Sequence, residues 1–129
     1  MHTFPVTVYY EDTDLGGIVY HANYLKFIER ARSAWVRALG IDQNALRAQG
    51  IVFAVHRIEA DFLSPAQLDD ALTVTTRPVA QTPARLTLDQ QVSRGGTLLF
   101  RARVTLVSIT TAGKPRRLPP ELLVLSGNA

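Results

Sequence analysis

Three observations predict an α+β fold for this chain of 129 residues. Apolar and polar residues alternate from Thr3 to Tyr10, which is typical of a half-buried strand. The apolar period lengthens to that of a helix from about His21 to Leu39, and strand-like alternation returns after Gly50. One strand, one long helix and about four further strands predict a two-layer domain, a five-stranded antiparallel sheet covered on one face by the helix.

The first strand places Tyr10 on the same face as Phe4, Val6 and Val8. Successive side chains of a strand point to opposite faces, so the ring of Tyr10 is expected to be buried with these residues. Pro5 suits an edge strand, because proline has no backbone N–H for a ladder hydrogen bond.

One apolar stripe defines the long helix, and Gly40 follows it as a residue that ends helices. Glu29 falls on the opposite, exposed face, where it is expected to pair with Lys26, Arg30 or Arg32. A short second helix is expected from Asp42 to Gln49, stopped by Gly50. The members of the stripe are Tyr24, Phe27, Ile28, Ala31, Ala34, Trp35 and Ala38.

The remainder of the chain has the pattern of strands joined by turns short enough for hairpin pairing. Arg94-Gly95-Gly96-Thr97 is a hairpin turn, and Pro78 and Pro83 are expected to bracket another. Residues 114–120 are expected to form an irregular basic tail, and a short apolar segment is expected to follow it from Leu122 to Leu125. The expected strands lie within 51–63, 72–76, 86–92 and 98–106.

Composition bounds the class of protein. A length of 129 residues with 47% hydrophobic residues predicts a single domain over 1–129 with a real core. The chain has no cysteine, which excludes disulfides, thiolate metal sites and a cysteine nucleophile.

There is no apolar run long enough to span a membrane and no signal-peptide pattern, so a cytoplasmic protein is expected. The net charge of +3 is scattered, which favours a phosphorylated small ligand over nucleic acid.

The most informative stretch lies between the first strand and the helix. It places Tyr10, Asp14 and His21 at intervals of four and seven residues, with Gly16-Gly17 between the carboxylate and the imidazole. Asp14 could act as a nucleophile or a general base, or it could cap the helix, as could Asp12. His21 could relay a proton or present its backbone N–H to an oxyanion, or it could be a solvated histidine.

Other catalytic classes lack their signatures. There is no Gly-x-Ser-x-Gly elbow and no phosphate loop, and His2, His21 and His56 do not have the spacing of metal ligands. No metal site is therefore expected. His56 is interpreted as a structural histidine in a strand. Lys114, Arg116 and Arg117 could hold phosphates, or they could be a solvated tail.

The run from Val8 to Arg32, with its Tyr-x3-Asp-x6-His pattern and following helix, resembles the signature of the hotdog-fold acyl-CoA thioesterases. Within the 4-hydroxybenzoyl-CoA thioesterase family it is most similar to the YbgC type, which is associated with the Tol–Pal system. The resemblance extends to the run Arg57–Pro65, to Leu68-Asp69-Asp70 and to the Pro-Arg-Arg-Leu-Pro tail. It implies a hotdog fold, in which the sheet wraps around one long central helix.

The resemblance also implies an activity, the hydrolysis of an acyl-CoA thioester to a free acid and coenzyme A. Asp14 occupies the catalytic position of the motif, and His21 and Tyr10 are implied as further catalytic residues. Tyr10 could equally be a core tyrosine. Gly17 would give the backbone room near the thioester, and Arg116 and Arg117 would bind the phosphates. No cofactor is implied beyond the coenzyme A of the substrate.

Partners and alternatives follow from the same features. The uncovered sheet edge predicts a homodimer, and we expect a dimer of dimers, a homotetramer. The resemblance also implies a site at a dimer interface, so the partner's run Arg57–Pro65 is expected in the pocket. Acyl carrier protein could replace coenzyme A as the donor, and the protein could lie at the periphery of the inner membrane. The alternative functions are an acyl-thioester hydratase or dehydratase, and a non-catalytic module that binds acyl-CoA or acyl carrier protein.

Overall fold

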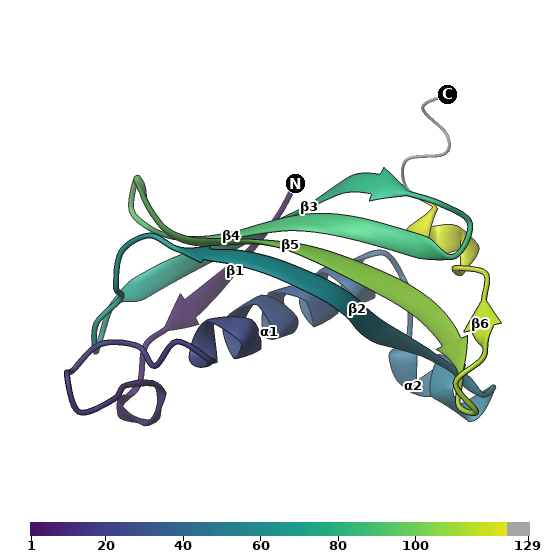
Figure 1. Cartoon of the computed structure of the whole chain (residues 1–129), viewed down its shortest axis with the longest axis horizontal. Helices are drawn as coiled ribbons and strands as arrows, with labels where there is room; N and C mark the ends of the chain where they lie inside the picture. The colour runs from purple at the N-terminus through teal and green to yellow at the C-terminus, as the bar shows by residue number, and fades with distance from the viewer. Residues whose placement is uncertain (124–129) are drawn as a thin grey trace.

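The structure is a computed structural model, and it describes residues 1–123. A curved antiparallel sheet wraps around the long helix α1 (Figure 1). The helical elements are η1 (Tyr10–Asp12), α1 (Asn23–Ala38), α2 (Gln43–Ala48) and η2 (Pro120–Leu122). The strands are β1 (His2–Thr7), β2 (Ile51–Phe62), β3 (Ala71–Gln81), β4 (Arg85–Arg94), β5 (Thr97–Thr110) and β6 (Pro115–Arg116).

The sheet has six strands rather than the five predicted, in the order β1-β3-β4-β5-β2 with β6 paired to β5. The basic tail supplies the extra strand, because Arg116 pairs with Ser108 and Pro115 with Ile109. The expectation that consecutive strands form hairpins is wrong for β2 and β3. β2 pairs with β5 instead and lies at an edge, so the segment between β2 and β3 crosses to the other side of the sheet.

The core lies between α1 and the sheet. α1 packs against β1, β3 and β4, and the side chains of Phe27, Ile28 and Ala31 are completely buried. Each large apolar side chain buried in this way contributes about 1.5–3 kcal/mol. The predicted apolar stripe is confirmed for most of its length, but Ala38 is exposed and Val36 is buried in its place.

Two polar residues of α1 depart from the predicted pattern. Arg32 was expected on the exposed face as a partner of Glu29, but only 9% of it is exposed. Its Nη1 donates to Gln90 Oε1 of β4 at 3.0 Å, and this hydrogen bond allows a charged side chain on the sheet-facing side of α1. Asn23, the first residue of α1, is also buried.

The prediction that Tyr10 is a buried strand residue is wrong. β1 ends at Thr7, and the chain turns into η1, where Tyr10 is 84% exposed. The carboxylate of Asp12 causes this turn, because its Oδ2 accepts a hydrogen bond from the backbone N–H of Tyr9 at 2.9 Å. A local side-chain hydrogen bond has thus replaced the continuation of the strand.

Proline positions refine the predicted turns. Pro78 lies inside β3 rather than at a turn, where the register shifts between Pro78 and Ala80. Such a bulge tolerates a residue without an N–H donor.

The hairpin turn at Gly95-Gly96 is confirmed. In the expected apolar segment from Leu122 to Leu125, Leu122 is buried in η2. Val124 and Leu125 lie outside the described residues.

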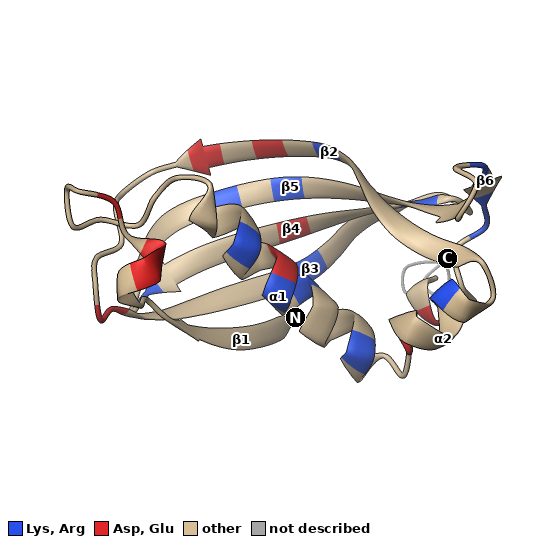
Figure 2. Cartoon of the chain, turned by 90° about the horizontal axis from the view of Figure 1, so that it is seen from below, with Lys and Arg blue, Asp and Glu red and all other residues tan. Residues whose placement is uncertain are grey.

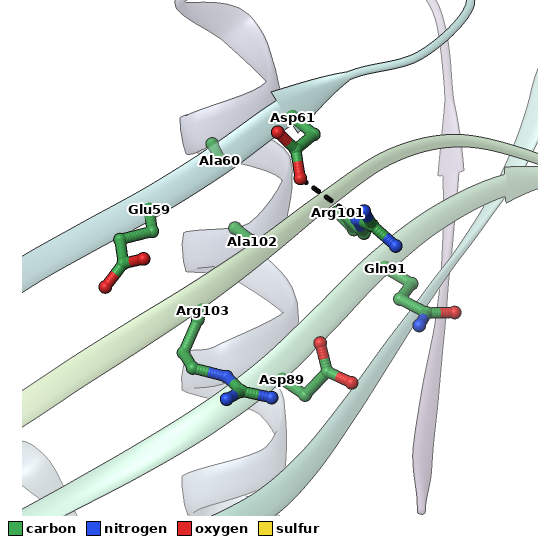
Figure 3. A pocket seen from close by; sticks show the side chains of 8 residues that line it. All are labelled: Glu59, Ala60, Asp61, Asp89, Gln91, Arg101, Ala102 and Arg103. Atoms are coloured by element: carbon green, nitrogen blue, oxygen red, sulfur yellow. Dashed lines mark hydrogen bonds and ion pairs between the residues drawn. The ribbon is translucent and has the colours of Figure 1, made fainter.

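The two faces of the sheet differ. The face away from α1 carries charged side chains in cross-strand pairs. One of them, Asp61–Arg101 at 3.0 Å, is drawn in Figure 3, and another is Arg77–Asp89 at 3.2 Å. On the other face α1 crosses below the middle of the sheet and does not cover the β2 edge (Figure 2). Phe62 and Val55 of β2, whose pairing partners Phe100 and Leu106 are buried, therefore remain 54% and 44% exposed.

Candidate active site

The segment from Tyr9 to Tyr24 forms the candidate site, and Asp12 holds it together. Asp12 is 3% exposed, and its Oδ1 accepts a hydrogen bond from Asn23 Nδ2 at 2.9 Å. Its backbone carbonyl accepts from the N–H of Tyr20 at 2.9 Å. Asp12 therefore ties both ends of the loop to the first residue of α1, a role that the sequence did not reveal.

Asp14 lies at the base of a tight turn that spans residues 14–18. Its backbone N–H donates to the carbonyl of Ile18 at 3.0 Å, and Gly17 N donates to the carbonyl of Asp14 at 3.1 Å. Gly17 has a φ of 77°, which favours glycine. The need for glycine at this position is thus explained by the turn itself.

The carboxylate of Asp14 is exposed. Its Oδ1 accepts a hydrogen bond from the backbone N–H of Gly16 at 2.8 Å, within the turn. The residue that precedes α1 is Ala22, and no side chain caps that helix end. Asp14 is therefore not the cap of α1, which was the competing interpretation of this residue.

His21 lies two residues before α1, with its ring between two aromatic side chains. The ring centroids are 4.5 Å from Tyr20 and 6.3 Å from Phe62, the latter in an edge-on arrangement. Among residues 1–123 the structure shows no hydrogen-bond acceptor for the backbone N–H of His21. An N–H group that is free at the positive end of a helix can bind an anionic oxygen.

Phe62 closes one side of the site and was not singled out as an individual residue by the sequence. It lies at the end of β2 and packs edge-on against Tyr24 and Phe100, with centroids 5.8 Å and 5.1 Å away. The hydroxyl of Tyr24 accepts a hydrogen bond from the N–H of Ala66 at 3.0 Å. The run Arg57–Pro65, which was expected to reach the site from a partner, thus contributes Phe62 to the site of its own chain.

The structure brings Asp14, His21 and Gly17 into one loop but does not bring Arg116 and Arg117 near them. Both arginines are exposed, at β6 and just after it. Figure 1 shows β6 at one end of the sheet and the loop between β1 and α1 at the opposite end. Tyr10 is in the loop, but its side chain is exposed on η1 rather than packed in the core.

A pocket of about 350 Å³ on the outer face of the sheet contains none of the predicted site residues (Figure 3). The residues that line it are Glu59, Ala60, Asp61, Asp89, Gln91, Arg101, Ala102 and Arg103. Within residues 1–123 the structure groups no three His, Asp or Glu side chains in a way that could hold a metal ion. In the same part of the chain no helix has the length and apolar character needed to cross a membrane.

Comparison with known proteins gives consistent results. Residues 8–124 match the model of the thioesterase-like superfamily. The chain is 40% identical to the acyl-CoA thioester hydrolase YbgC of Escherichia coli O6:H1 over 122 residues, which cover 93% of this chain and 91% of that protein.

Solved structures confirm the predicted hotdog fold. A probable thioesterase from Bartonella henselae superposes with a TM-score of 0.88 and 41% identity, covering 92% of this chain and 98% of that one. A 1,4-dihydroxy-2-naphthoyl-CoA thioesterase from Synechocystis superposes with a TM-score of 0.86 and 26% identity, covering 93% and 90% of the two chains.

Proposed function

This chain belongs to the thioesterase-like superfamily, and from this we infer that it is an acyl-CoA thioester hydrolase, which converts an acyl-CoA and water into a free acid and coenzyme A. The observation that carries the proposal is the loop from Asp12 to Asn23. It presents an exposed carboxylate and a free backbone N–H on one short segment beside the start of α1.

We assign the attack on the thioester to Asp14. As a general base, its carboxylate takes a proton from water while the water oxygen bonds to the carbonyl carbon. As a nucleophile, it bonds to that carbon itself, and water hydrolyses the resulting anhydride. On either route the carbon–sulfur bond breaks and the thiolate of coenzyme A leaves. The hydrogen bond from Gly16 fixes one carboxylate oxygen and leaves the other for the reaction.

The backbone N–H of His21 is assigned to the oxygen that becomes negative during this attack. It lies at the N-terminal side of α1, where the helix dipole favours negative charge. Removal of one such donor typically slows catalysis by about 10²–10³. Tyr10 remains a proposed member of the catalytic group, with its exposed ring available to substrate or to a second subunit.

A homodimer through the β2 edge would complete the site. β2 is a long edge strand of 12 residues, and the apolar face beside it is not covered by α1. Such edges are usually protected, and a symmetric partner is the commonest protection. A partner would also exclude water from Asp14, which is exposed in the single chain. A dimer of dimers is the proposed final assembly.

The dimer also gives Arg116 and Arg117 a role. If two β2 edges pair in antiparallel fashion, the Phe62 end of one strand lies beside the Ile51 end of the other. The end of β5 that pairs with Ile51 also pairs with β6, so the arginines of one subunit approach the loop of the other. Their charge suits the phosphates of coenzyme A, or an acidic acyl carrier protein.

The resemblance to YbgC-type proteins supports two further parts of the proposal, a cytoplasmic location at the periphery of the inner membrane and an association with the Tol–Pal system. Fractionation of cells that express the tagged protein would test the first. Recovery only in the soluble fraction would contradict the membrane-peripheral location but not the cytoplasmic one. Co-purification with Tol or Pal proteins would test the second part, and purification without them would contradict it.

The experiment that tests the activity is thiol release from a panel of acyl-CoAs with short, medium, long and aromatic acyl groups. Hydrolysis of at least one of them by the parent protein, lost in Asp14→Asn, is the expected result. Binding without hydrolysis of any member of the panel would favour the non-catalytic binding module.

A further inference from the structure

Residues 63–70 connect β2 to β3, and we call them the crossover segment. They lie at the same end of the sheet as the loop that precedes α1 (Figure 1). The backbone N–H of Val19 donates to the carbonyl of the buried Ala66 at 2.8 Å, and Ile18 pairs with Gln67 in an antiparallel bridge. The carbonyl of Ile18 also accepts the hydrogen bond that closes the turn of the catalytic carboxylate. The crossover segment therefore sets where this turn lies relative to the sheet.

Arg94, the last residue of β4, holds the crossover segment at two points. Its Nη1 donates to Asp70 Oδ2 at 2.6 Å and to the carbonyl of Pro65 at 3.4 Å. The same Oδ2 atom accepts from the backbone N–H of Gln67 at 2.8 Å, and the N–H of Asp70 donates to the carbonyl of Gln67 at 3.1 Å. One guanidinium thus binds both sides of the segment, on a strand that is hydrogen-bonded to both β3 and β5.

The turn at the end of the crossover segment contains a residue in an uncommon conformation. Asp69 has a φ of 70°, in the left-handed region that few residues other than glycine adopt. Its N–H donates to the carbonyl of Val8, and the N–H of Val8 donates to the carbonyl of Asp70, both at 3.0 Å. Such conformations persist where the surrounding contacts enforce them, and they concentrate at functional sites.

The ion pair Arg77–Asp89 shows what is particular to Arg94 and Asp70. The two carboxylates are almost equally exposed, Asp70 at 19% and Asp89 at 18%. Arg77 and Asp89 are directly paired residues of neighbouring strands, so their ion pair joins elements that the sheet already holds together. Asp70 lies outside the strands. The bond from Arg94 therefore fixes a connecting segment to the sheet, and with it the loop that the segment contacts.

We propose that Arg94 is a positioning residue for Asp14, because it holds the crossover segment and the segment holds the turn in which Asp14 lies. The hydrogen bonds inside that turn fix its shape but not its place relative to α1. A displacement of about 1 Å at a reacting group can slow a reaction about 10²-fold. This inference rests on the proposed function and adds to it a residue that acts through the backbone of the loop.

Arg94→Ala tests the proposal with the acyl-CoA of the panel that the parent protein hydrolyses fastest. It should lower kcat about tenfold or more and change KM less than about twofold, because Asp14 is displaced while the proposed phosphate contacts lie at the other end of the sheet. Arg77→Ala removes the comparison pair and should leave kcat and KM unchanged. Arg94→Lys keeps the positive charge for Asp70 and should restore most of kcat.

Amide hydrogen exchange gives a readout that does not depend on activity. The N–H of Val19 should exchange about tenfold or more faster in Arg94→Ala than in the parent, because its acceptor Ala66 lies in the loosened segment. The N–H of Ala31, completely buried in α1, should be accelerated much less. This difference separates a local release of the loop from a general loss of stability.

Asp70→Asn is the second variant if Arg94→Ala does not fold. It keeps an oxygen acceptor for Gln67 and removes the charge that Arg94 binds, so it should also lower kcat and leave KM unchanged. An unchanged kcat in the folded variants, or equal acceleration of exchange at Val19 and Ala31, would overturn the positioning role alone. No hydrolysis of any acyl-CoA by the parent would overturn the proposed function, and the exchange of Val19 would still report whether Arg94 holds the loop.

Discussion

The side chains of Asp12 and Asn23 are joined by a buried hydrogen bond of 2.9 Å that spans 11 residues of the chain. It links the turn after β1 to the first residue of α1, and the whole catalytic loop lies between these two points. The loop that carries Asp14 and His21 is therefore closed at its base by two side chains that do not themselves take part in the proposed reaction.

The central prediction concerns Asp14→Asn. The amide oxygen of asparagine can still accept the hydrogen bond from Gly16, so the turn and the melting temperature should stay close to the parent. Asparagine cannot act as a base or a nucleophile, so kcat should fall by about 10² to 10⁴. Glu11→Gln, at an exposed carboxylate of the same loop, is the matched control and should retain activity. Retention of more than a tenth of kcat by a folded Asp14→Asn protein would show that the carboxylate is structural.

Asp12→Asn should act on stability. The carboxylate of Asp12 accepts hydrogen bonds from both Tyr9 N–H and Asn23, and an amide cannot accept at both positions. Either the buried donor of Asn23 or the partly buried N–H of Tyr9 is left unpaired, at a cost of up to about 1–3 kcal/mol. Thermal and urea unfolding should show this loss. Asp61→Asn removes an exposed ion pair and should have a much smaller effect. Equal Tm values for the parent and Asp12→Asn would contradict the anchoring role.

The ion pair between Asp70 and Arg94 predicts a dependence of stability on pH. The backbone N–H of Gln67 lowers the pKa of Asp70; burial opposes this effect, and Arg94, with Nη1 at 2.6 Å from Asp70 Oδ2, adds to it. Because the pKa is lower in the folded state than the usual value of about 3.9, the stabilisation is complete well above pH 4. It is lost as the pH falls through the lowered value.

Asp70→Asn should therefore unfold at lower urea concentration than the parent at pH 7, and the difference should shrink as the pH falls below about 4. Urea unfolding at pH 7, 5 and 3 measures this. A difference that is the same at pH 7 and pH 3 would mean that the ionised form of Asp70 contributes nothing. Asp89→Asn, in a pair on the outer face, provides a comparison.

Replacement of Arg116 and Arg117 together by alanine should raise KM for acyl-CoA more than it lowers kcat, because phosphate contacts are equal in the ground and transition states. Arg30 and Arg37, replaced together, are the control on exposed α1 positions. Unchanged KM and kcat would identify the arginines as a solvated segment.

A mixing experiment tests whether these arginines act across subunits. When Asp14→Asn subunits are refolded with Arg116→Ala/Arg117→Ala subunits, a mixed dimer should contain one site with both defects and one intact site. Activity at low substrate should then exceed that of either variant alone. If both residue sets served the site of their own chain, no intact site would form and activity would not recover.

Val55→Lys tests the dimer interface. Val55 is 44% exposed on the apolar side of the β2 edge, and a charge there would be buried by a partner. Sedimentation should show a shift toward monomer at micromolar concentration, with a matching loss of activity. Thr105→Lys, on the opposite face of β5, is the control. A fully active Val55→Lys oligomer would place the interface elsewhere.

The local sequence determined most of the secondary structure and the position of the catalytic loop. The 3.6-residue stripe of α1 and the alternation in β4 and β5 reflect burial on one face, which a sequence records directly. Glycine at position 17 and the hairpin at Gly95-Gly96 follow from backbone geometry in the same way. The family resemblance then supplied the assignment of Asp14, which spacing alone left open between catalysis and capping.

Only the tertiary structure decided the features that depend on contacts distant in sequence. The pairing of β2 with β5 rather than β3, the buried Asp12–Asn23 bond and the burial of Arg32 against Gln90 each join segments far apart in the chain. A polar residue looks exposed in a sequence pattern until its partner is known, because burial of a polar group is stable only when its hydrogen bonds are made. Tyr10 is a different case, because it followed the strand pattern but left the strand through a local contact, the hydrogen bond from the backbone N–H of Tyr9 to Asp12.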